Sequence, residues 1–193
     1  MNLPRLIFLV STLLVVLIAL CTLRAQHRPT ENVNRDALIQ QDFQNRIAAY
    51  MKLRKTVEAE LPKLKPTELS AKIAEHEHEL ARRIRVARRH ARQGEFFNAE
   101  IGAEFRRLIG ITMRGSEAAR IQQSLRSAEP VDPQLRVNDE YPVSIPLQST
   151  PPTLLENLPK LPPEVDYRVA AHDLLLRDAG ANLIVDLLPG AIP

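Results

Sequence analysis

Two groups of side chains that could do chemistry lie close together, between residues 76 and 92. The string His76-Glu77-His78-Glu79 alternates imidazoles and carboxylates, which Zn²⁺ and Ni²⁺ accept as ligands. On a helix, residues three or four apart share a face, so His76 can act with Glu79, whereas His76 and His78 diverge. Two ligands make a weak site without a third. We therefore interpret the string first as a solvated helix face and keep His76, His78 and Glu79 as candidate metal ligands.

The second group is the densest run of charge in the chain. From Leu80 to Arg92 there are six arginines and no carboxylate. The residues that we predict to contact a partner are Arg82, Arg85, Arg88, Arg89 and Arg92. Anionic lipid, lipopolysaccharide, another acidic component of the cell envelope or an envelope protein would suit this surface. The alternative is that the arginines form ion pairs with nearby glutamates, namely Glu58, Glu60, Glu75 and Glu79.

Other chemistry has weaker support in the sequence. Four aspartates of the C-terminal tail could suggest Ca²⁺, but their spacing fits no calcium loop: Asp166, Asp173, Asp178 and Asp186. His172 precedes Asp173, yet adjacent residues of a strand point to opposite faces. No glycine-rich phosphate loop and no serine in a strand–turn–helix elbow is present. We expect no enzymatic activity and no cofactor, with a hydrolase as a weaker alternative.

The N-terminus predicts export. Residues 1–25 have the features of a signal peptide or an N-terminal membrane anchor, because Arg5 precedes a stretch without charge from Leu6 to Leu23. Cleavage after Ala25, retention as an inner-membrane anchor and lipidation at Cys21 are the three alternatives. The expected location is therefore the bacterial periplasm or cell envelope. Because an exported chain is separated from nucleic acid, and because the arginines lack interleaved aromatic residues, no nucleic-acid partner is expected.

The elements that must position these side chains are mainly helical over residues 30–128. Apolar residues at steps of three and four predict helices over 34–61, from Thr67 or Ser70 to Gln93, from Asn98 onward, and over 116–128. The first two form an antiparallel hairpin in this interpretation. Its expected contacts are Tyr50 with Ile84, Ile47 with Ala87 and Phe43 with Ala91.

Two smaller regions complete the expected organisation. Residues 129–164 are rich in proline and predict an extended strap lying across the helices, because a flexible linker would not need their leucines; a disordered segment is the alternative. Residues 165–193 contain three short apolar runs separated by turn residues, which predict a β-meander with one apolar face, packed on the helices. The expected fold class is α+β, mostly α.

Several segments carry a resemblance to known proteins. The segments GEFFNAEIGAEFRRLI, VNDEYPVSIPL, PPTLLENLPKLPPEVDYRV and HDLLLRDAGANLIVDLLP resemble an uncharacterised family of exported bacterial envelope proteins. That resemblance implies an envelope location and one architecture, and it carries no catalytic residues. The tail alone is similar to the C-terminal strands of periplasmic nickel/cobalt-homeostasis proteins, although the chain lacks their His-rich tracts.

These observations lead to one expectation and one alternative. We expect a non-enzymatic interaction or structural module of the envelope, with the arginine-rich face of the second helix as its contact surface. The alternative is a periplasmic metal-binding or metal-homeostasis accessory protein that uses His76, His78 and Glu79.

Overall fold

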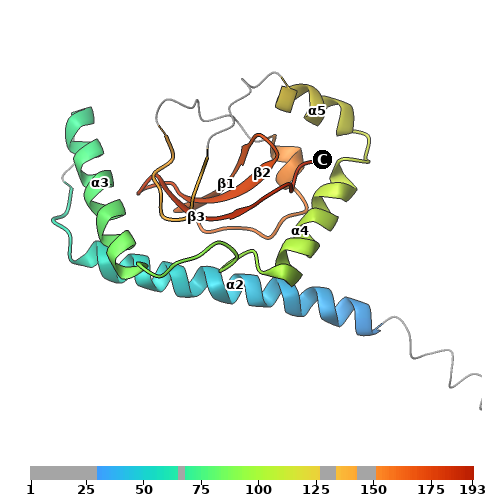
Figure 1. Ribbon diagram of the computed structural model, residues 1–193, viewed down its shortest axis with the longest axis horizontal. Coiled ribbons are helices and arrows are strands. Elements are labelled where there is room, and N and C mark those ends of the chain that lie inside the picture. Colours follow the sequence, from blue (N-terminus) through green and yellow to red (C-terminus); the bar gives the residue numbers. More distant parts are fainter. Residues whose placement is uncertain (1–29, 65–67, 127–133, 143–150) are drawn as a thin grey trace, which may run out of the picture. The chain divides into compact units, whose positions relative to one another are not determined.

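The computed structural model describes residues 30–64, 68–126, 134–142 and 151–193. The chain divides into two compact units, residues 1–38 and 39–193, and every described element after Leu38 belongs to the second. The described elements, shown in Figure 1, are α2 (Thr30–Ala59), α3 (Ser70–Ala87), α4 (Ala99–Thr112), α5 (Ala118–Arg126), α6 (Pro152–Leu155), β1 (Val165–Ala170), β2 (Asp173–Asp178) and β3 (Leu183–Leu188). The predicted class, α+β and mostly α, is confirmed.

The C-terminal tail forms the predicted three-stranded meander. The sheet order is β1-β2-β3, both neighbouring pairs are antiparallel, and the register of the second pair shifts at Leu176/Arg177. Asn182 takes a positive φ of 47° in the second turn, as its side chain allows. However, every residue of β3 is buried. The expectation of one apolar face was therefore wrong, since both faces of the sheet are covered.

The two faces belong to different cores. One is packed by helices, through side chains such as Leu174, Leu176 and Val185 of the sheet. The other forms a smaller cluster from Leu175, Ile184 and Leu187 together with residues of the 134–142 segment. That segment also bonds to the outer edge of β3: the Asn138 and Tyr141 amides donate to the carbonyls of Ile184 and Asn182. A sheet buried on both faces needs apolar residues at consecutive positions, which explains the continuous apolar runs of β2 and β3.

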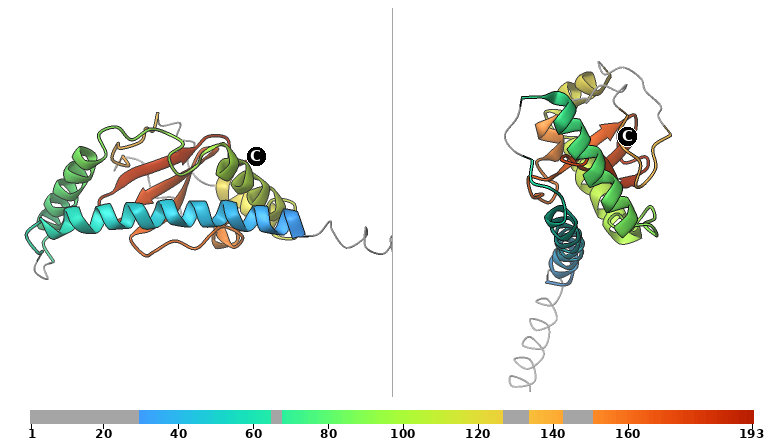
Figure 2. Two further views of the ribbon diagram at one scale, coloured as in Figure 1. Left: turned by 90° about the horizontal axis from the view of Figure 1, so that it is seen from below. Right: turned by 90° about the vertical axis from the view of Figure 1, so that its left-hand side faces the viewer.

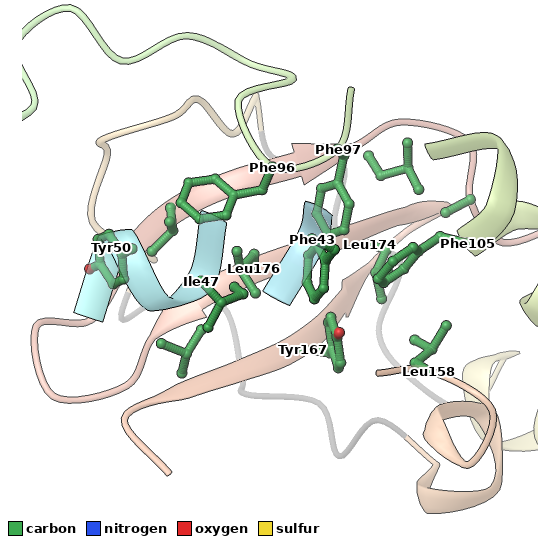
Figure 3. Close-up of a cluster of buried hydrophobic side chains, with 14 of the residues drawn as sticks. Phe43, Ile47, Tyr50, Phe96, Phe97, Phe105, Leu158, Tyr167, Leu174 and Leu176 are labelled. Carbon is green, nitrogen blue, oxygen red and sulfur yellow. The ribbon is translucent and has the colours of Figure 1, made fainter. Parts of the chain in front are cut away.

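The main core is aromatic where α2 meets the segment before α4. The Phe43 ring lies 4.9 Å from Phe105 and 6.1 Å from Phe97, and Tyr50 meets Phe96 edge-on at 6.0 Å. Figure 3 shows this row of rings packed against the leucines of the sheet. All four predicted helices place apolar residues in this core: α2, α4 and the short α5, and α3 through Leu80 and Ile84 of its expected stripe.

The second helix differs from the prediction. It ends at Ala87 rather than Gln93, and residues 88–97 run as an irregular segment beside α2 while α3 is inclined to it (Figure 2). Phe96 and Phe97 of this segment, rather than Ala87 and Ala91 of a longer helix, cover the stripe of α2. Phe43 packs on Phe97, and Ala91 lines a hollow with Arg46 and Tyr50.

The later described part of the proline-rich region, residues 151–164, packs on the main core. Leu154 of α6 and Leu158 are buried in the main core, and the Tyr167 hydroxyl donates to the Pro159 carbonyl at 3.0 Å. The single turn of α6 was not predicted. The expectations for residues 129–133 and 143–150, and those for the export segment, fall outside the described residues. Among the helices that are described, none combines the length and the apolar composition needed to cross a membrane.

Candidate functional site

The six arginines of the run after Leu80 have three different environments. Arg82 and Arg83 both donate to Glu79 at 2.7 Å, and Arg83 also reaches Glu60 at 3.5 Å. This is the ion pairing that the alternative interpretation expected. These bonds hold the pKa of Glu79 down at about 2. The Arg82 side chain is nevertheless 60% exposed.

Arg88 is not a surface residue. Its side chain is 6% exposed, and its guanidinium donates to the Val185 carbonyl and to Glu95, each at 3.0 Å. The same group lies over the rings of Tyr50 and Phe96, 5.4 and 5.6 Å from their centroids. Arg88 therefore joins the helices to β3, and we remove it from the predicted contact surface.

The remaining arginines lie at the periphery. Arg85 donates to Glu140 of the segment that covers the sheet, and its side chain is partly exposed. Arg89 and Arg92 are exposed. Together with Arg82 they form what we call the arginine surface, defined as Arg82, Arg89 and Arg92.

The candidate metal ligands His76, His78 and Glu79 line one hollow of about 1080 Å³, but they do not form a metal site. His78 Nδ1 lies 2.8 Å from Glu140 Oε2, and Glu79 is occupied by two arginines. Among the residues that the structure describes, no group of three or more His, Cys, Asp or Glu side chains could hold a metal ion.

The aspartates of the tail serve as acceptors for hydrogen bonds within the fold. Asp186 is fully buried and accepts the amides of Gly94, Phe96 and Phe97 at 2.7–2.9 Å. Asp178, also fully buried, accepts the Tyr50 hydroxyl at 2.7 Å and Arg54 at 2.8 Å.

The other two tail aspartates are occupied in the same way. Asp166 accepts Arg168 and Arg177, and Asp173 accepts the amide of Gly190. Each carboxylate is thus explained by a structural bond, as is His172, whose Nδ1 lies 3.1 Å from the carbonyl of Ile192.

A groove between α2 and α3 is the feature that sequence reasoning missed. It has a volume of about 780 Å³, and its apolar lining consists of Ala49, Leu53, Val57, Val86 and Ala87. Lys52, Arg82 and Arg83 stand along it with Thr56 and Glu60. We call this the interhelix groove. The predicted closed hairpin would have filled it, and no pattern in either helix alone signals that the two diverge.

The groove continues toward the core. A second hollow of about 410 Å³ shares Ala49, Leu53 and Ala87 with it and extends to Ala91 and Phe96. The cations in this extension are already used: Arg88 as described, and Arg46 by Asp42 and the Glu95 carbonyl. The groove cations other than Arg46 and Arg88 are therefore Lys52, Arg82 and Arg83, which line the larger, 780 Å³ part.

Comparison with known proteins adds no identification. The chain matches no protein-family model, and no curated protein or solved structure is significantly similar to it. The resemblances given above thus stay predictions, and the functional argument depends on the geometry of the chain itself.

Proposed function

We propose that the protein is a non-enzymatic interaction module of the bacterial cell envelope, exported or membrane-tethered, which binds an anionic partner through the arginine surface. The observation that supports this proposal is the contrast within one run of arginines. Arg88 is buried in the fold, whereas Arg89 and Arg92 are exposed in a stretch without carboxylates. Arg82 is also exposed, although it pairs with Glu79. The cationic C-terminal end of α3 also suits the helix dipole, so the charge there is stable without a partner.

The chemistry of the surface favours phosphate-bearing partners. Arginine guanidinium groups present a planar fork that binds phosphate oxygens in pairs. Anionic phospholipid and lipopolysaccharide both carry such groups at high density, so several weak contacts add up. An acidic envelope protein is the second kind of partner that this surface would accept. The metal-binding alternative has only two neighbouring ligands, His78 and Glu140, among the described residues.

Reversing the charge of the exposed arginines tests the proposal. We expect the double variant Arg89→Glu and Arg92→Glu to weaken binding of lipopolysaccharide and of phosphatidylglycerol more than tenfold, because each surface charge contributes about 1 kcal/mol. The full-length protein would be immobilised in uncharged detergent, and binding would be measured at low and moderate salt. Arg88 must stay unchanged, since its reversal would place a carboxylate in the core.

The matched control is Arg114→Glu with Arg120→Glu. Both residues are exposed, and they lie outside the arginine surface, after α4 and in α5. An equal loss in the control pair would mean that net charge and not this surface determines binding. Unchanged binding in the test pair would contradict the proposal, and micromolar binding of Ni²⁺ or Zn²⁺ that depends on His78 would favour the metal-binding alternative.

A further inference from the structure

The interhelix groove joins an apolar trough to a cationic rim. Ala49 and Ala87 are exposed, and Val86 is 63% exposed, which is high for an apolar residue in a helix facing a neighbour. Side chains this small leave the floor of the trough open rather than filling it. A volume of about 780 Å³ lies within the range of small-molecule sites.

The charge along the groove is concentrated and only partly compensated. Three cations line it, Lys52, Arg82 and Arg83. Glu60 is the carboxylate of the lining, and Glu79 pairs with both arginines from beside the groove. Lys52 forms no ion pair among the residues that the structure describes, and Arg82 is largely exposed despite its bonds to Glu79. The extension toward Phe96 offers apolar surface, while its own arginines are occupied.

From this arrangement we infer that the interhelix groove binds a single-chain anionic lipid with a phosphate headgroup. The acyl chain lies along Leu53, Val86 and Ala87, and the phosphate is held by Lys52 and Arg82. The inference rests on the proposed function for its partner class and assigns that class a second site, which shares Arg82 with the arginine surface. An acidic amphipathic helix would need available cations along the whole groove, whereas here they lie in one part of it.

The sharpest variant fills the trough without touching the core. Ala49→Leu adds a side chain to the groove floor at an exposed helical position, and Ala48→Leu adds the same volume one residue away, outside the groove. Lys52→Glu reverses the headgroup contact, and Lys55→Glu reverses an exposed lysine of the same helix outside the groove. All four positions are exposed in α2, so the variants are expected to fold.

Native mass spectrometry of the full-length protein, released from a short polyoxyethylene detergent, measures retained ligand directly. We expect one dodecyl phosphate per chain in the wild type, Ala48→Leu and Lys55→Glu, and at least a tenfold lower occupancy in Ala49→Leu and Lys52→Glu. Inorganic phosphate and dodecyl maltoside should be retained at least tenfold less than dodecyl phosphate. The first lacks the acyl chain, and the second lacks the phosphate group.

Several results would overturn the inference. Equal occupancy of dodecyl phosphate in Ala49→Leu and Ala48→Leu would mean that its acyl chain binds elsewhere, for example on the N-terminal apolar segment. Equal retention of laurate would remove the phosphate assignment, and retention of an acidic amphipathic peptide in place of dodecyl phosphate would reassign the groove to a protein partner. Because Arg89 and Arg92 lie outside the groove, loss of binding in their variant tests the proposed function independently.

Discussion

Buried carboxylates connect segments of this protein that lie far apart in the sequence. Asp186 accepts hydrogen bonds from the backbone amides of Gly94, Phe96 and Phe97, which lie about ninety residues earlier in the chain. Asp178 binds Tyr50 and Arg54 of α2 in the same manner. A buried charge is tolerated only where donors surround it, and both carboxylates have such donors. The tail aspartates therefore attach the sheet to the helices.

Replacing Asp186 by Asn tests this role at the scale of one residue. The amide has one oxygen in place of two acceptors and brings an NH₂ group toward backbone donors. We expect a loss of about 3 kcal/mol in the free energy of unfolding, because charged acceptors are lost and amides are left unpaired. Urea unfolding of Asp186→Asn measures it, with exposed Asp139→Asn as the control. A loss below that of the control would show that the amides find other acceptors.

Helix ends decide where the aromatic segment enters the core. Asn98 begins α4 by accepting the Ile101 amide at 2.9 Å, which fixes the direction of the chain just after Phe97. Gly94 precedes this cap with a φ of 89°, a left-handed conformation that glycine adopts without strain. The two residues together turn the chain so that Phe96 and Phe97 point toward α2.

Loss of the cap should act on stability alone. We expect Asn98→Ala to lower the free energy of unfolding by about 1 kcal/mol, the usual contribution of an N-cap. Asn98→Ser retains a hydroxyl acceptor and should stay within a few tenths of the wild type. Thermal unfolding of the three proteins compares them, and a serine variant as unstable as the alanine variant would show that Asn98 acts through another contact.

At the scale of the whole molecule, stability should depend on pH at both extremes. Burial would raise the pKa of Asp166, but bonds from Arg177 and Arg168 outweigh it, so this pKa lies below its usual range. Burial raises the pKa of Tyr167 well above 10, and burial together with Asp178 raises that of Tyr50. An acid whose pKa is lowered by folding stabilises the fold at pH values above its pKa in the unfolded chain. This stabilisation is lost as the pH falls. A raised tyrosine pKa gives stability that is complete below pH 10 and is lost above it.

We therefore expect a stability plateau between about pH 5 and 9, with losses below pH 4 and above pH 10. Melting temperatures measured from pH 2 to 12 would show both limbs. Tyr167→Phe should flatten the alkaline limb while it leaves the acid limb unchanged, because phenylalanine does not ionise. An unchanged alkaline limb in this variant would assign that loss to Tyr50 or to the lysines.

Much of the fold follows from local patterns. The meander, α2, the Asn98 cap of α4 and the short α5 could be predicted because hydrophobic period and turn residues act over a few neighbours. The end of α3 could not. Gln93 and Gly94 have the residue types of a helix C-terminus, but the helix ends at Ala87. Arg88, the next residue, donates a hydrogen bond to the Val185 carbonyl, ninety-seven residues away in the sequence.

The candidate site divides in the same way. The amino-acid sequence by itself determined the charge of the arginine run, since charge follows from composition, and it suggested the class of partner that we propose. Only the tertiary structure decided that Arg88 is buried while Arg89 and Arg92 are exposed. It also decided that Phe97 packs on Phe43 and that α2 and α3 leave a groove between them. Which side chains pack together depends on residues far apart in the sequence. A pattern among neighbouring residues therefore does not specify it.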